Sequence, residues 1–256
     1  MAKSSTARAR SGSLLENVKT IVYAGLIAIG IRTVAFEPFN IPSGSMEPTL
    51  LVGDYLFVSK FSYGYSRFSL PFAPDVFHGR IFGRLPERGD VAVFYPPNKP
   101  ETYIKRIIGL PGDRIQMKDG QLYINGVLCP RQRIGDYISR DYGPSVIIAE
   151  YAETLPNGRK HDILKIRDDD GNSYIKVNNT PEYKVPEGHV FAMGDNRDNS
   201  LDSRVMTADG VGFVPVENLV GRAEFLFFSI DAQYPWWEFW EWPFEIRWSR
   251  LLRGIE

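Results

Sequence analysis

The chain has 256 residues, of which 43% are hydrophobic and 24% are charged, and its formal net charge is −1. That length and composition suit one sizeable core or two small domains and exclude a disordered chain. The near-neutral charge provides no global basic field, so we predict no nucleic-acid partner. The single cysteine, Cys129, excludes an internal disulfide, and the three histidines share no metal-ligand spacing. We therefore expect neither a metal nor another cofactor.

An apolar run near the N-terminus predicts a transmembrane anchor at residues 21–36. It begins as IVYAGLIAIGI and continues past Arg32 to Phe36, before Glu37 and Pro38 end it. Its length of roughly sixteen residues falls short of the ~20 that a spanning helix needs. Arg32 lies near the end of the run, where its long side chain can reach the membrane interface, so the short length is tolerable.

The charges around this run predict its orientation. Four lysines and arginines lie within residues 1–20, whereas none follows Arg32 until Lys60. We therefore expect residues 1–20 to be cytoplasmic and the chain after Pro38 to lie on the opposite side of the membrane. Two alternatives remain open for the run. One is a cleavable secretion signal with Thr33 and Ala35 before the cut, and the other is a buried core helix.

The remainder of the chain predicts a mainly β fold. Short runs rich in Val, Ile, Tyr and Phe, such as DYLFVSKF, DVAVFYP and HVFAMGD, are typical of strands. Asp119-Gly120 and Asn125-Gly126 are strong tight-turn signals, which favour antiparallel hairpins. Residues 116–189 are more polar and richer in turns than their flanks. We expect an antiparallel β domain at 37–115 and 190–256, with 116–189 as an inserted smaller β subdomain and one transmembrane helix in front.

Two residues suggest nucleophilic chemistry without a histidine. Ser45 follows Pro42-Ser43-Gly44, where glycine permits a tight backbone that can present a hydroxyl and nearby N–H groups. A serine hydroxyl needs a positioned base, and no histidine lies near this serine in the sequence. Lys105 lies in an apolar strand, and burial would keep its amine neutral by lowering the pKa. Each feature alone is common, so the prediction depends on their occurring together.

Three segments occur together: IPSGSMEPTLLVGDYLFV from Ile41, ERGDVAVFYPPNKPETYIKRIIGLPGD from Glu87, and GDNRDNSLDSR from Gly194. In this combination and order the chain closely resembles the type I signal peptidases, which are Ser-Lys proteases that remove signal peptides from exported pre-proteins. The resemblance implies that Ser45 attacks the scissile carbonyl through an acyl-enzyme and that Lys105 takes its proton. It further implies that Ser43 and the Ser45 N–H form the oxyanion hole, and that Ser200 orients the lysine amine.

The same resemblance implies how substrate is bound. The family binds the residues before the cut as an extended strand, with two shallow pockets for small side chains. The matching groove positions are Phe39, Ile41, Pro42, Tyr103 and Ile104. The charged residues of the motifs are better interpreted as paired structural groups than as acids or bases; they are Arg106, Asp195, Arg197, Asp202 and Arg204.

The implied partners are the signal peptides of secreted pre-proteins, membrane lipid and the protein-export machinery. The implied location is the bacterial cytoplasmic membrane, crossed once, with the catalytic domain on the extracytoplasmic side. Two other functions stay open. One is a self-cleaving Ser-Lys protein akin to the SOS repressors, although no DNA-binding region precedes the β region. The other is a membrane-tethered β domain that binds extended peptides without cutting them.

Overall fold

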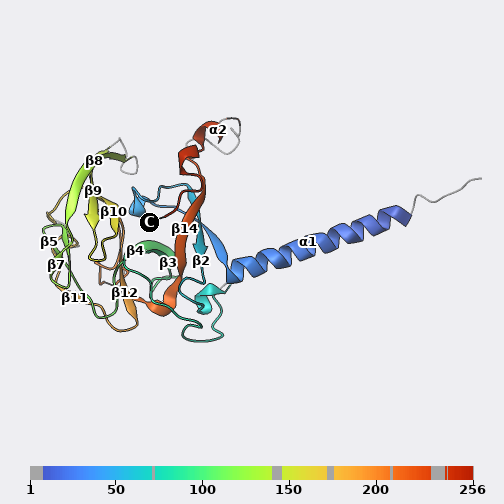
Figure 1. The fold of residues 1–256 in the computed structure, drawn as a ribbon, viewed down its shortest axis with the longest axis horizontal. Coiled ribbons are helices and arrows are strands. Elements are labelled where there is room, and N and C mark those ends of the chain that lie inside the picture. Colours follow the sequence, from blue (N-terminus) through green and yellow to red (C-terminus); the bar gives the residue numbers. More distant parts are fainter. Residues whose placement is uncertain are drawn as a thin grey trace, which may run out of the picture.

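A computed structural model describes residues 8–70, 73–139, 146–171, 176–207, 210–231, 240 and 242–255. Its longest element is the helix α1 (Arg8–Val34), which projects away from the β structure (Figure 1). The segment Leu15–Val34 is long and apolar enough to cross a membrane, with a mean hydropathy of 1.3 and 0% of it buried. A core helix would be buried, so that alternative is wrong. The helix begins well before residue 21 because residues 8–20 contain no proline that would prevent helical pairing.

A seven-stranded sheet forms the centre of the molecule. Its order is β1-β2-β14-β3-β4-β12-β13, and every neighbouring pair is antiparallel. The strands are β1 (Phe36–Asn40), β2 (Asp54–Ser59), β14 (Leu219–Ser229), β3 (Val91–Phe94), β4 (Tyr103–Gly109), β12 (His189–Met193) and β13 (Val214–Pro215). Strand β14 comes late in the chain yet lies between β2 and β3, so the sheet is continuous only once this late segment is in place (Figure 1).

Two smaller antiparallel sheets hold most of residues 116–189. One has the order β10 (Lys160–Lys165), β9 (Val146–Thr154), β8 (Arg131–Ser139). The other has the order β11 (Tyr183–Lys184), β5 (Arg114–Lys118), β6 (Gln121–Ile124), β7 (Val127–Leu128). The mainly β fold with antiparallel sheets and one N-terminal apolar helix is confirmed. The division into a β domain at 37–115 and 190–256 and an inserted subdomain at 116–189 stays a prediction.

The tight turns of the smaller sheets have the predicted chemistry. Asp119 and Gly120 have φ values of 46° and 68°, and Asn125 and Gly126 have φ values of 54° and 80°. Two successive residues with positive φ are what a two-residue hairpin turn of matching twist requires. The sequence signals therefore fix where β5, β6 and β7 reverse direction.

The remaining elements are short. They are the 3-10 turns Gly44–Met46, Arg67–Ser69, Val216–Asn218 and Trp248–Arg250, and the helix α2 (Trp242–Glu245). The turn at Gly44–Met46 matters most here, because it follows β1 directly and carries Ser45. Met46 is buried in the same apolar cluster as Leu56 and Val58 of β2, so the turn is anchored to the sheet.

Candidate active site

The loop that carries Ser45 is held from two sides. Before it, the Ile41 amide donates to the Asp54 carbonyl at 2.9 Å, which extends the pairing of β1 with β2. After it, Asn196 donates from its backbone to the Ser45 carbonyl at 3.2 Å and from its side-chain amide to the Gly44 carbonyl at 3.1 Å. Ser45 is buried, with its hydroxyl in a cavity wall. The position of Ser45 is therefore fixed by hydrogen bonds to the backbone of its loop, in addition to side-chain packing.

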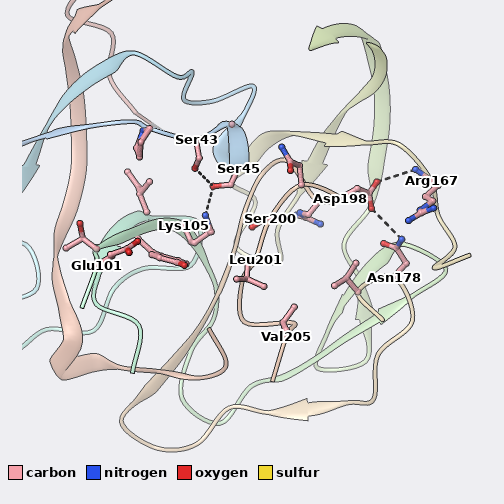
Figure 2. Close-up of a pocket in the computed structure, with 18 of the residues that line it drawn as sticks. Ser43, Ser45, Glu101, Lys105, Arg167, Asn178, Asp198, Ser200, Leu201 and Val205 are labelled. Carbon is pink, nitrogen blue, oxygen red and sulfur yellow. Dashed lines mark hydrogen bonds between the residues drawn. The ribbon is translucent and has the colours of Figure 1, made fainter. Parts of the chain in front are cut away.

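Lys105 meets Ser45 inside this cavity. It lies on β4 opposite Ala92 of β3, and it is only 4% exposed. Its Nζ atom donates a hydrogen bond to Ser45 Oγ at 2.5 Å (Figure 2). The Tyr103 ring, two residues away on the same strand face, has its centroid 5.7 Å from this nitrogen. The strand thus brings together two residues that are sixty positions apart, as the sequence suggested.

Burial lowers the pKa of the Lys105 amine to about 8. The carboxylates of Asp202 and Asp195 oppose this shift, and the Arg204 guanidinium adds to it. A lysine with this pKa is neutral in a useful fraction of molecules near neutral pH, whereas a solvated lysine is not. The amine can therefore accept a proton from a neighbouring hydroxyl.

Ser43 and Ser200 both line the cavity that contains Ser45 and Lys105. Ser43 Oγ lies 3.5 Å from Ser45 Oγ. Ser200 is packed against Gly194, where an added Cβ would lie 2.2 Å from Ser200 Oγ and 2.5 Å from the Ser45 carbonyl oxygen. Among the described residues, no hydrogen bond joins Ser200 to Lys105. Glycine is required at position 194 because any side chain there would collide with Ser200 and with the Ser45 carbonyl oxygen.

The predicted structural charges form two buried ion pairs behind the cavity. Arg106 donates to both carboxylate oxygens of Asp195, at 2.9 and 2.8 Å. Arg204 does the same to Asp202, at 2.9 and 2.8 Å. Burial opposes ionisation of both acids, but the neighbouring guanidinium outweighs it and holds each pKa below its ordinary value. These residues therefore carry fixed charges and shape the field at Lys105.

Arg197 is paired as well, although by a residue that the sequence did not point to. Its guanidinium lies against the carboxylate of Glu153, which comes from β9 in a smaller sheet. The backbone continues the connection, because the Leu164 amide of β10 donates to the Asp195 carbonyl and the Arg197 amide donates to the Leu164 carbonyl, both at 3.0 Å. The insert thus supports the motif loop that faces Ser45.

The cavity has a volume of about 660 Å³ and extends to both sides of Ser45. Figure 2 shows Glu101 at one end and Arg167, Asn178 and Asp198 at the other. Of the predicted groove residues, Pro42, Tyr103 and Ile104 belong to its lining. Phe39 and Ile41 pack in the apolar cluster beneath it, and Ile41 is only 2% exposed.

A second lysine with a lowered pKa lies next to the cavity. Lys165 is buried at the end of β10, and burial lowers its pKa to about 8 against the opposing charge of Asp198. Its Nζ atom lies 2.6 Å from the Asp198 carboxylate and donates to the Asn178 side chain at 2.5 Å. Because this amine is held by a carboxylate, it is a weaker candidate for a base than Lys105, which faces a serine.

Comparison with known proteins identifies the family. The model of the family described as signal peptidase, peptidase S26, matches residues 14–228. The chain belongs to this family, and it is a peptidase.

Similar proteins from other organisms are also signal peptidases. A signal peptidase I of Rickettsia conorii is 47% identical over 216 residues, covering 83% of this chain and 78% of that protein. A signal peptidase I of Rickettsia massiliae is 45% identical over 223 residues, covering 86% of this chain and 80% of that protein. A solved signal peptidase I structure from Enterococcus faecalis is 29% identical, covers 54% of this chain and 97% of that chain, and has a TM-score of 0.31.

Proposed function

We propose that the chain removes N-terminal signal peptides from exported pre-proteins, with Ser45 as nucleophile and Lys105 as general base. The observation that carries this proposal is the 2.5 Å contact between Lys105 Nζ and Ser45 Oγ in a buried setting that lowers the lysine pKa. A nucleophile and its base within hydrogen-bond reach are the basis of covalent hydrolysis. Family membership supplies the substrate class.

The mechanism begins with proton transfer from Ser45 Oγ to the neutral Lys105 amine. As the proton moves, Oγ bonds to the scissile carbonyl carbon and the carbonyl oxygen becomes an oxyanion. The Ser43 hydroxyl and the Ser45 N–H are the donors proposed for that oxyanion. The C–N bond then breaks, and the lysine ammonium returns its proton to the leaving amine, which leaves an acyl-enzyme on Ser45. Water, deprotonated by the same amine, hydrolyses the ester.

Substrate would bind as an added strand along β4. This strand pairs with β3 along its first four residues, from Tyr103 to Arg106, but its other edge pairs with β12 only from Arg106 onward within the described residues. The free edge at Tyr103–Lys105 can therefore accept backbone hydrogen bonds from an extended peptide that leads to Ser45. Ile104 and Pro42 belong to the cavity lining and would contact the small side chains before the cut.

The proposed location is the bacterial cytoplasmic membrane, with α1 crossing once and the β domain on the extracytoplasmic side. The exposed apolar helix supports anchoring, and the positive charges before it support the orientation. The proposed partners are the signal peptides of secreted pre-proteins, membrane lipid and the protein-export machinery.

The test is cleavage of a pre-protein by the full chain in membrane vesicles. Ser45→Ala and Lys105→Ala should each abolish processing, whereas Lys165→Arg, which keeps a buried charge beside the cavity, should stay active. A reactive lactam should acylate Ser45 in the parent, detected by mass spectrometry. Full activity in Ser45→Ala would refute the nucleophile. Peptide binding without any cleavage or acylation would instead support the non-cleaving peptide-binding domain.

A further inference from the structure

The membrane helix and the catalytic domain are joined without a linker. Helix α1 ends at Val34 and strand β1 begins at Phe36, so that only Ala35 lies between them. A flexible tether needs several residues of irregular chain, which this junction lacks. The relative orientation of helix and domain is therefore set by contacts at the junction.

The Glu37 carboxylate is at the centre of these contacts. Arg32 of α1 donates from Nε and Nη2 to Glu37 Oε1, at 3.1 and 2.8 Å. Lys60, which follows β2, places its Nζ 2.9 Å from Glu37 Oε2 and also donates to the Ser69 carbonyl at 2.5 Å. Lys60 is only 2% exposed, whereas the Arg32 side chain is 60% exposed. One carboxylate thus connects a cation of the helix to a cation buried in the domain.

Two further hydrogen bonds hold the last turn of the helix. The Tyr65 hydroxyl donates to the Val34 carbonyl at 2.7 Å, and the Lys60 amide donates to the Ala35 carbonyl at 3.0 Å. Carbonyls at a helix C-terminus have no partner within the helix. Here the catalytic domain supplies the donors, so the helix end is capped by the domain itself.

Strand β1 connects this junction to the nucleophile. It pairs with β2 along its whole length, from Phe36 opposite Ser59 to Asn40 opposite Tyr55. Ser45 lies eleven residues beyond Val34. A fully extended chain of that length spans at most about 40 Å. Because the intervening strand is paired rather than free, the distance from the helix end to Ser45 is fixed as well as short.

We propose that Arg32 and Tyr65 are positioning residues, which fix the height and orientation of the catalytic cavity over the membrane surface. The inference deepens the proposed function, on which it rests. A signal peptide has its own apolar segment in the bilayer, which sets the height of the scissile bond above the membrane. Helix α1 sets the height of Ser45 in the same way, and cleavage requires the two heights to match. A domain free to tilt at the junction would present Ser45 at many heights, and productive encounters would be rarer.

The test compares a membrane-inserted pre-protein with a short soluble peptide that has the same cleavage site. The variant Arg32→Lys with Tyr65→Phe keeps the interfacial positive charge and the Glu37–Lys60 pair, but loses the forked donors of the guanidinium and the cap on Val34. We expect the pre-protein cleavage rate to fall about tenfold while kcat/KM for the soluble peptide changes by less than about twofold. A matched control is Arg133→Lys, because Arg133 forms an exposed ion pair with Asp136 far from the junction.

Two outcomes would overturn the proposal. Equal losses on both substrates would mean that the junction acts only on the integrity of the domain, and no loss on the pre-protein would mean that the orientation is not fixed there. A series of pre-proteins with lengthened spacers between apolar segment and cut provides a second readout. The parent should prefer one spacer length and the double variant should accept a wider range. If the parent cuts neither the pre-protein nor the soluble peptide, the proposed function itself is refuted, independently of the junction.

Discussion

Lowering the pH below about 8 should reduce cleavage of a soluble peptide tenfold for each pH unit, because only the neutral Lys105 amine can accept the Ser45 proton. Burial places the pKa of this amine at about 8. About one molecule in ten then has a neutral lysine near pH 7, and about one in a hundred near pH 6. The measurement is kcat/KM against pH on a soluble peptide, which avoids any effect of pH on membrane insertion.

Two variants assign this pH dependence to a residue. Lys105→Arg places a permanent positive charge at the same site and should be inactive at every pH tested. Lys165→Arg keeps the ion pair with Asp198 but removes a second lysine near the cavity whose pKa burial lowers to about 8. Its profile should match that of the parent. Activity that stays flat down to about pH 6, or a profile that changes in Lys165→Arg, would refute the assignment of Lys105 as base.

Three further predictions concern stability and packing. Lys105→Met should be inactive, yet below pH ~8 it should be more stable than the parent by up to about 3 kcal/mol, because the buried cation is gone. Between about pH 8 and 10.5 the unfolded parent holds a proton that the folded parent does not, so the parent gains stability and the difference should shrink. Denaturation of both proteins at several pH values measures this difference. Gly194→Ala should lower kcat at least about tenfold with substrate binding less affected, because its Cβ would displace Ser200 and the Ser45 carbonyl; unchanged kinetics would contradict this packing. Arg106→Met should lower the free energy of unfolding by about 3–5 kcal/mol, because a buried carboxylate loses its partner, and a melting temperature close to that of the parent would count against it.

The contact between Ser45 and Lys105 was expected from the sequence because three motifs occur together in the order that resembles a known family. A serine in a glycine turn and a lysine in an apolar strand are uninformative separately. Together with the segment GDNRDNSLDSR from Gly194, they indicate an active site. The hairpin turns were also predictable, since Asp119-Gly120 and Asn125-Gly126 need positive φ at both positions. The turns are local features, which a single sequence expresses directly, whereas the pair could be expected only through the combination of distant motifs.

Other parts of the site could not be predicted, because they depend on contacts between distant segments. Asn196 donates to the loop that carries Ser45, and nothing in its own neighbourhood in the sequence indicates that partner. Ile41 matched a groove position, but it lies just after β1 and is buried in an apolar cluster with residues of β2, β3 and β14. The insertion of β14 between β2 and β3 is likewise a property of topology, which no local pattern encodes.

The late position of β14 in the chain has a consequence for when the surroundings of Ser45 and Lys105 can form. Ser45 and Lys105 both lie on the N-terminal side of this strand, and the sheet that holds them apart from water and in contact is incomplete until residues 219–229 are in place. A chain that lacks β14 has an incomplete sheet around β3 and β4, and a lysine that is exposed to water stays protonated near neutral pH. Under the proposed mechanism, insertion of β14 between β2 and β3 must therefore precede any proton transfer from Ser45 to Lys105.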